Sequence, residues 1–72
     1  METTAIPPIY VVNYKDNFIG DCTEIFHDER AALHYYTDII DVYELRASLT
    51  QMKAEPNGAY SIDKVLAAND NN

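Results

Sequence analysis

Hydrophobic and polar residues in the first third of the chain follow the pattern of a β-hairpin. Residues 9–14 are almost all β-branched or aromatic, and the turn-forming sequence Lys15-Asp16-Asn17 comes directly after them. This order predicts a strand that leads into a hairpin. We expect the return strand over residues 18–26, with a β-bulge near Gly20, where the alternation of apolar and polar residues is broken.

The middle of the chain has the spacing of an amphipathic helix. Its apolar residues recur at intervals of three and four positions: Ala32, Leu33, Tyr36, Ile39 and Ile40. Asp28 is a suitable N-cap, and Glu29 would lie in the first turn, where the helix dipole favours negative charge. The pattern predicts a helix over residues 28–40 with one apolar face.

The segment after this helix fits two different structures. Apolar residues alternate over residues 43–49, as in a half-buried strand, but they also form a stripe at helical spacing over residues 42–52. We favour a third strand over residues 42–47, followed by a short helix over residues 48–54 that opens with the capping box Ser48-x-x-Gln51. A single helix is the alternative.

A turn and a last helical segment are expected near the C-terminus. The sequence Glu55-Pro56-Asn57-Gly58 predicts a turn, because proline presets its backbone angle and Asn-Gly accepts positive φ. Ser61 is expected to cap one or two helical turns, with Ile62, Val65 and Leu66 facing inward. Residues 69–72 are polar and predict a frayed tail.

Together these elements predict an α+β fold: a β-hairpin and a helix, then a third strand in the order ββαβ, then short helical segments. A single small domain is expected over residues 9–68, because 72 residues are too few for two cores. Pro7 and Pro8 favour extended chain, so residues 1–8 should form a loose tail. Cys22 is the only cysteine, so no disulfide within the chain can stabilise the domain.

The negative charge of the chain is concentrated in its middle. The formal net charge is −7, and residues 16–44 hold eight of the 12 acidic residues against a single base, Arg30. Direct nucleic-acid binding is disfavoured, because it depends on clustered Lys and Arg. The charge instead favours a larger protein with a basic surface as the partner.

Motifs for catalysis or cofactor binding are not found in the sequence. Cys22 with His27 or His34 would be the only nucleophile and base, and nothing near Cys22 in the sequence would activate its thiol. Gly20 and Gly58 are too far apart to form a phosphate-binding loop. We therefore expect a protein that is not an enzyme and uses no cofactor and no metal. A weak metal site at His27 and His34 is a minor hypothesis.

Signals for secretion or membrane insertion are also missing. The N-terminus has no basic region followed by an apolar stretch, and no run of about 18 apolar residues occurs anywhere in the chain. We expect a cytoplasmic protein without membrane contact.

The residues expected to bind the partner are acidic, apart from one tyrosine. Tyrosine is frequent in interfaces because it combines a large apolar ring with a polar tip, and Tyr35 would reach an outer face of the helix. The candidate partner-binding residues are Asp21, Glu24, Asp28, Glu29, Tyr35, Asp38, Asp41 and Glu44.

In its small size and acidity the chain resembles the accessory proteins of phages and mobile elements, anti-CRISPR inhibitors among them. The resemblance implies an inhibitor that works in the cytoplasm of a host cell, where carboxylates take the place of nucleic-acid phosphates. The expected function is therefore non-catalytic binding to a basic, nucleic-acid-binding surface. The alternative is a structural or regulatory module that forms a homodimer, with the charge serving only solubility.

Overall fold

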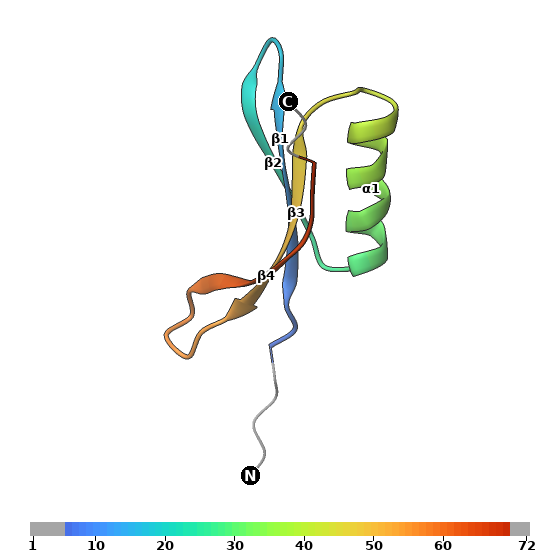
Figure 1. The fold of residues 1–72 in the computed structure, drawn as a ribbon. Helices are drawn as coiled ribbons and strands as arrows, with labels where there is room; N and C mark the ends of the chain where they lie inside the picture. The colour runs from blue at the N-terminus through green and yellow to red at the C-terminus, as the bar shows by residue number, and fades with distance from the viewer. Residues whose placement is uncertain (1–5, 70–72) are drawn as a thin grey trace.

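An antiparallel sheet with one helix packed on it makes up the fold (Figure 1). The structure is a computed structural model and describes residues 6–69. Its elements are β1 (Ile9–Asp16), β2 (Gly20–Phe26), α1 (Glu29–Asp41), β3 (Ala47–Ala54) and β4 (Tyr60–Asn69). The strands lie side by side in the order β2-β1-β3-β4, and every neighbouring pair is antiparallel. This arrangement confirms the predicted α+β class.

Three local predictions are confirmed by the structure. β1 begins at Ile9, as expected, and leads into a hairpin. α1 begins directly after Asp28, whose Oδ2 accepts a hydrogen bond from the Ala31 amide at 2.9 Å. At the predicted turn, the amide of Gly58 donates to the carbonyl of Glu55 at 2.9 Å, and Gly58 has a φ of 91°. In all three places the signal comes from residues close together in the chain.

The predicted β-bulge near Gly20 is wrong. β1 and β2 pair without a break from Tyr10 and Phe26 to Asp16 and Gly20. Gly20 instead ends the turn between the strands, with a φ of 101° that residues other than glycine rarely adopt. The broken alternation in the sequence reflects the turn at residues 17–19 rather than an extra residue in the strand.

The predictions for residues 42–54 are also wrong. Residues 42–46 form a loop instead of a strand, and residues 48–54 belong to β3 instead of a helix. The alternative of one helix over residues 42–52 fails for the same reason. β3 is a central strand, hydrogen-bonded to β1 on one side and to β4 on the other. This pairing overrides the helix propensity of its Leu, Gln, Met and Lys residues.

At the C-terminus, β4 takes the place of the helical segment predicted after Ser61, so the order is ββαββ rather than ββαβ. Asn69, expected in the frayed tail, is the last residue of β4. The remaining tail residues, 70–72, and the first five residues of the predicted N-terminal tail lie outside the described residues.

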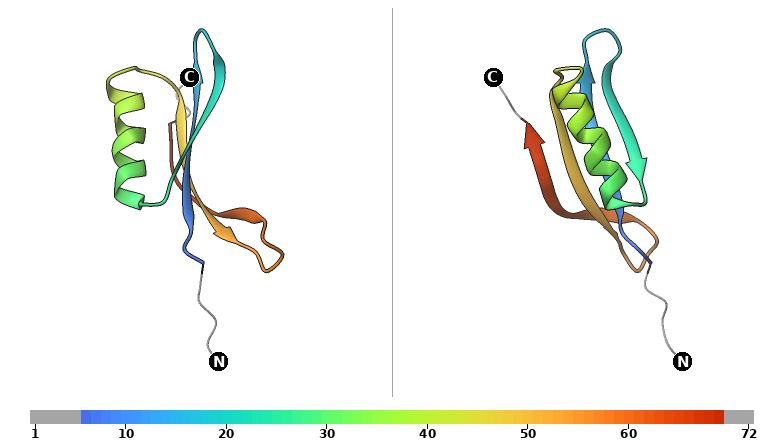
Figure 2. Two further views of the ribbon diagram at one scale, coloured as in Figure 1. Left: turned by 180° about the vertical axis from the view of Figure 1, so that it is seen from behind. Right: turned by 90° about the vertical axis from the view of Figure 1, so that its right-hand side faces the viewer.

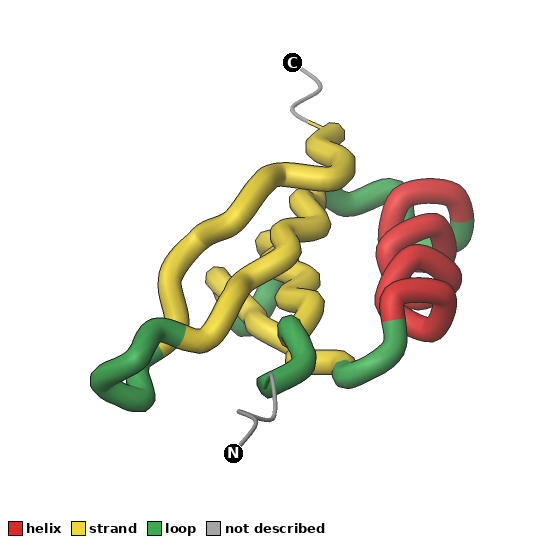
Figure 3. Tube along the Cα trace, turned by 90° about the horizontal axis from the view of Figure 1, so that it is seen from below, coloured by secondary structure: helices red, strands yellow, loops and turns green. Residues whose placement is uncertain are grey.

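The core lies between α1 and one face of the sheet. The helix packs mainly on the two central strands, β1 and β3, and Figures 2 and 3 show it on one side of the strands. Val12 of β1 and Leu49 of β3 are the largest fully buried side chains. The buried cluster comprises Val12, Ala32, Tyr36, Ile39, Ala47 and Leu49.

Two register shifts give the β3–β4 hairpin its shape. They fall between Leu49 and Thr50 and between Gln51 and Met52 on β3, where β4 contributes an extra residue each time. Such bulges increase the twist of a strand pair and bend it. The outer half of this hairpin accordingly bends away from α1, toward the other side of the sheet (Figures 1 and 2).

Candidate protein-binding surface

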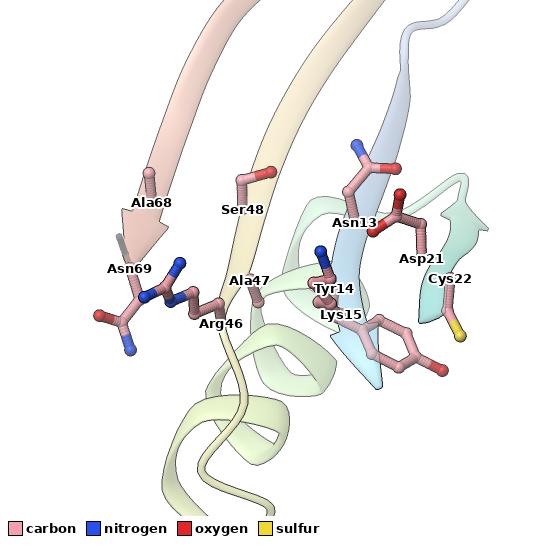
Figure 4. Close-up of a pocket in the computed structure, with 10 residues that line it drawn as sticks. All are labelled: Asn13, Tyr14, Lys15, Asp21, Cys22, Arg46, Ala47, Ser48, Ala68 and Asn69. Carbon is pink, nitrogen blue, oxygen red and sulfur yellow. The ribbon is translucent and has the colours of Figure 1, made fainter. Parts of the chain in front are cut away.

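The two candidate carboxylates of β2 lie on opposite faces of the sheet. Glu24 pairs with Val12, which is buried under α1, so Glu24 lies on the helix-bearing face. Asp21 pairs with Lys15 and lies on the other face (Figure 4). The structure therefore separates Asp21 from the other candidate residues.

The remaining five candidate carboxylates belong to α1 or to the loops at its ends. Asp28 and Glu29 lie at the start of the helix, Asp38 and Asp41 in its second half, and Glu44 in the loop that follows. All are exposed except Asp38, which is half-buried. We call these five residues and Glu24 the acidic surface. It lies on the side of the sheet that carries α1.

Tyr35 is held in an aromatic cluster at the flank of α1 that faces β2. Its hydroxyl donates a hydrogen bond to the Tyr14 hydroxyl at 3.3 Å, and the two ring centroids are 6.1 Å apart. Its ring also packs against Phe26, with the centroids 5.3 Å apart. The hydrogen bond with Tyr35, together with partial burial, raises the pKa of Tyr14 above its ordinary value. Tyr35 is therefore half-buried and fixed in place, beside the acidic surface.

The helix C-terminus carries carboxylates where the helix dipole disfavours them. Asp41 is the last residue of α1, and the last turn, which the structure describes in full, contains no basic residue. Glu44 follows with a φ of 56°, a left-handed conformation that is unfavourable for residues other than glycine. This conformation lets the amide of Leu45 donate to the carbonyl of Ile39 at 3.1 Å and turns the chain toward β3. Both carboxylates thus stand at positions that reduce stability.

The β1–β2 turn presents two apolar side chains on an ordered loop. The Oδ1 atom of Asp16 accepts hydrogen bonds from two amides, those of Phe18 at 2.7 Å and Ile19 at 3.0 Å. These bonds stabilise the charged form and hold the pKa of Asp16 below its ordinary value. Phe18 is 97% exposed and Ile19 is also exposed, so the turn holds two large apolar groups in solvent.

The loop after α1 exposes two more apolar residues at the same end of the molecule. Val42 and Tyr43 are both largely exposed, between the carboxylates of Asp41 and Glu44. The β1–β2 turn and the α1–β3 loop both lie at the upper end of Figure 1, and the Lys15 amide donates to the Arg46 carbonyl at 3.1 Å nearby. We call Phe18, Ile19, Val42 and Tyr43 the apolar end.

Sequence reasoning missed the apolar end because it assigned these four residues to strands. Phe18 and Ile19 were expected in the return strand, and Val42 and Tyr43 in a third strand. An apolar residue in a strand has an ordinary structural role, whereas one in a polar loop points to an interface. For Phe18 and Ile19, the missing signal was the turn at residues 17–19, because its position depends on the register of the hairpin.

A shallow hollow of about 610 Å³ is lined by residues of all four strands, near the end of the sheet where β1 leads into the β1–β2 turn (Figure 4). Lys15, Asp21 and Arg46 are the charged residues in its lining. Cys22 also lines it, and its thiol donates to the Gly20 carbonyl at 3.6 Å. His27 and His34 are not part of this lining. The hollow therefore does not join Cys22 to either imidazole, as nucleophilic catalysis would require.

The structure also bears on metal binding and membrane insertion. Among residues 6–69, no three His, Cys, Asp or Glu side chains come together as a metal site requires, so the hypothesis based on His27 and His34 gains no support. In the same part of the chain, α1 is too short and too polar to cross a membrane.

Comparisons with known proteins find no match: no protein-family model fits the chain, and no curated protein or solved structure is significantly similar to it.

Proposed function

We propose that this protein is a non-catalytic binding module whose acidic surface and apolar end dock on a basic surface of a larger protein. The observation that carries the proposal is the position of Asp41 and Glu44. They stand at the negative end of the α1 dipole, and Glu44 has an unfavourable left-handed backbone. Charges that reduce the stability of a small domain are explained if they face cations on a partner.

The apolar end supplies what the carboxylates lack. Exposed charges mainly speed encounter and orient a complex, whereas a few buried aromatic or aliphatic side chains provide most of the affinity. Phe18 and Tyr43 are large, exposed and close in sequence to carboxylates, Asp16 and Glu44. This combination suits a partner surface with an apolar pocket surrounded by Lys and Arg.

A protein surface that binds nucleic acid is the class of partner that we favour. Such surfaces carry clustered Lys and Arg for phosphate groups. Carboxylates spaced along α1 and its loops would form ion pairs with those Lys and Arg side chains and exclude the nucleic acid. The protein would then act as an inhibitor, as its likeness in size and acidity to the anti-CRISPR inhibitors of phages implies.

The experiment is a pull-down with the full chain at low ionic strength, with captured proteins identified by mass spectrometry. The affinity of each purified captured protein is then measured at low and high salt, with and without an oligonucleotide competitor. We expect binding that weakens with salt and with the competitor. Binding that neither salt nor the oligonucleotide competitor weakens would refute the proposal.

A pair of matched variants separates specific docking from overall charge. Asp41→Asn/Glu44→Gln removes two negative charges from the acidic surface, and Glu55→Gln/Asp63→Asn removes two from the β3–β4 hairpin. We expect roughly tenfold weaker binding for the first pair and little change for the second. Equal losses would show that only net charge matters, and the proposed surface would be wrong.

A further inference from the structure

The face of the sheet opposite α1 is apolar at the end that holds Ile9 and Val11, where a solvated face would be polar, and its other end carries Asn13, Thr23 and Ser48. Antiparallel sheets with one helical layer usually alternate apolar and polar residues, so that the outer face meets water. Among residues 6–69, no second layer packs on this outer face, and only the outer half of the β3–β4 hairpin bends toward it (Figures 2 and 3). Its side chains nevertheless include several large aliphatic groups.

The strand register places these groups in two adjacent rows. In the first row, cross-strand partners connect all four strands: Ile25, Val11, Thr50 and Val65. The second row, next to it, is formed by Ile9, Met52 and Ile62. We call these seven residues the apolar sheet face.

The edges of the apolar sheet face are open to solvent, and its middle is not. Ile9, Val11 and Thr50 are buried, although no second layer packs on this face in the described part of the chain. Ile25 on one edge strand and Val65 on the other are 58% and 59% exposed, and Ile62 is 65% exposed. Large aliphatic side chains therefore remain in water at both edges of the sheet.

Charge distinguishes this face from the rest of the molecule. All seven residues are uncharged, and at the far end of the same face Lys15 pairs with Asp21, so their charges balance. The net charge of −7 comes from residues 16–44, which mostly lie on the helix-bearing side. Two copies of this chain repel each other least when they meet through this face, because their acidic surfaces then point away from each other.

We infer that the protein forms a two-fold homodimer in which the apolar sheet faces of two copies pack on each other. The same patch on both copies gives a self-complementary contact, and two sheets stack at about 10 Å with their side chains interdigitated. Residues 1–5 and 70–72 of the chain itself are mostly polar and poorly suited to cover this face. A basic partner would favour the acidic surface, not an uncharged face.

The dimer would also add stability to a chain of this length. A domain of about 70 residues buries a small core and is often stabilised by association. The interface would add a second apolar layer on the other side of the sheet. The acidic surface and the apolar end stay free, so each dimer would present two copies of the proposed docking site.

The test is the molar mass of the purified chain by sedimentation velocity and light scattering from low to high micromolar concentration. We expect a shift from 8.2 kDa toward twice that mass. Because net-negative copies repel each other, added salt should leave the dimer unchanged or strengthen it. A monomer at all concentrations, or a dimer that dissociates as salt rises, would overturn the inference.

Matched lysine substitutions locate the interface. Val65→Lys places an ammonium group in the apolar sheet face, and Val42→Lys makes the same change at a similarly exposed valine in the α1–β3 loop, 65% exposed. We expect Val65→Lys to raise the dimer dissociation constant roughly tenfold or more and Val42→Lys to leave it unchanged. Equal effects of the two variants, or an effect of Val42→Lys alone, would contradict the inference.

A third variant guards against a loss of folding. Ile25→Lys changes the opposite edge strand, and circular dichroism shows whether each variant keeps the native secondary structure. Folded monomers of both Val65→Lys and Ile25→Lys support the interface, whereas folded dimers of both refute it. Binding to a basic partner by a folded Val65→Lys monomer tests the proposed function separately, because this variant leaves the acidic surface intact.

Discussion

The hydroxyl group of Tyr35 on α1 donates a hydrogen bond to the hydroxyl group of Tyr14 on β1, 3.3 Å away. Once one of two hydrogen-bonded phenols loses its proton, the resulting anion holds the proton of the other more tightly. The pKa of Tyr14 is accordingly raised above its ordinary value of 10.0. The same hydrogen bond joins the helix to a central strand at the edge of the core.

Tyr35→Phe should lower the pKa of Tyr14 toward its ordinary value. A raised pKa in the folded state contributes stability below pH 10.0 that is lost as the pH rises through the folded-state value. The unfolding free energy of Tyr35→Phe should accordingly fall less steeply in alkaline solution than that of the wild type. Phenolate absorbance as a function of pH measures the shift. Burial also raises the pKa of Tyr36, so at least one late-titrating phenol is expected in every variant. An unchanged number of late-titrating phenols in Tyr35→Phe, with fewer in the control Tyr43→Phe, would contradict this assignment.

Asp28→Ala should destabilise the domain by about 1 kcal/mol, because it leaves the Ala31 amide at the start of α1 without its acceptor. Asp28→Asn keeps a side-chain oxygen at the same place and should lose much less. Urea denaturation gives the unfolding free energy of each variant. If the two variants were equally stable, the cap would not be the reason that α1 begins here.

Local signals predicted β1 and α1, but the second half of the sheet depends on distant residues. Ile62 and Val65 are three positions apart, which suggested one face of a helix, yet both lie on the same face of β4. The register shift between Gln51 and Met52 inserts an extra residue between them, so a bulged strand acquires helical spacing. This shift follows from pairing with β3, and the sequence of residues 60–69 does not reveal it.

The candidate site, like the fold, could be predicted only where its signal comes from residues close together in the chain. The acidic residues of α1 could be grouped from the sequence, because net charge and the helix can both be read locally, and their role in binding stays a prediction. Asp21 was grouped with Glu24 although an odd number of positions separates them, which places them on opposite faces once the strand is known. The exposure of Phe18 follows from the hairpin register and could not be inferred from composition.

Glu44→Gly should stabilise the domain by about 1 kcal/mol. Glycine adopts the φ of 56° without steric cost, and the substitution removes a carboxylate from the negative end of α1. Glu44→Gln removes only the charge and should gain a smaller part of this free energy. Thermal and urea unfolding measure both effects, and partner binding should weaken in both variants. A destabilised Glu44→Gly variant would show that the side chain makes favourable contacts at this position.

Phe18→Ala should separate binding from stability. The side chain is 97% exposed, so its removal should change the unfolding free energy by less than about 0.5 kcal/mol. If Phe18 anchors the complex, its removal should weaken partner binding roughly tenfold or more. Ile62→Ala removes a similar exposed apolar group on the opposite sheet face and should leave partner binding unchanged. Undiminished binding by Phe18→Ala would remove the β1–β2 turn from the proposed interface.

The ordered turn that presents Phe18 should loosen in acid. The amides of Ile19 and Phe18 stabilise the Asp16 carboxylate and lower its pKa below 3.8, so this contribution to stability is present above pH 3.8 and is lost as the pH falls through the folded-state pKa. Amide proton shifts of Phe18 and Ile19, followed by NMR, should titrate together with a midpoint below 3.8. Asp16→Asn should keep an acceptor for the turn but abolish this titration. A midpoint at or above 3.8 would mean that the carboxylate does not order the turn in solution.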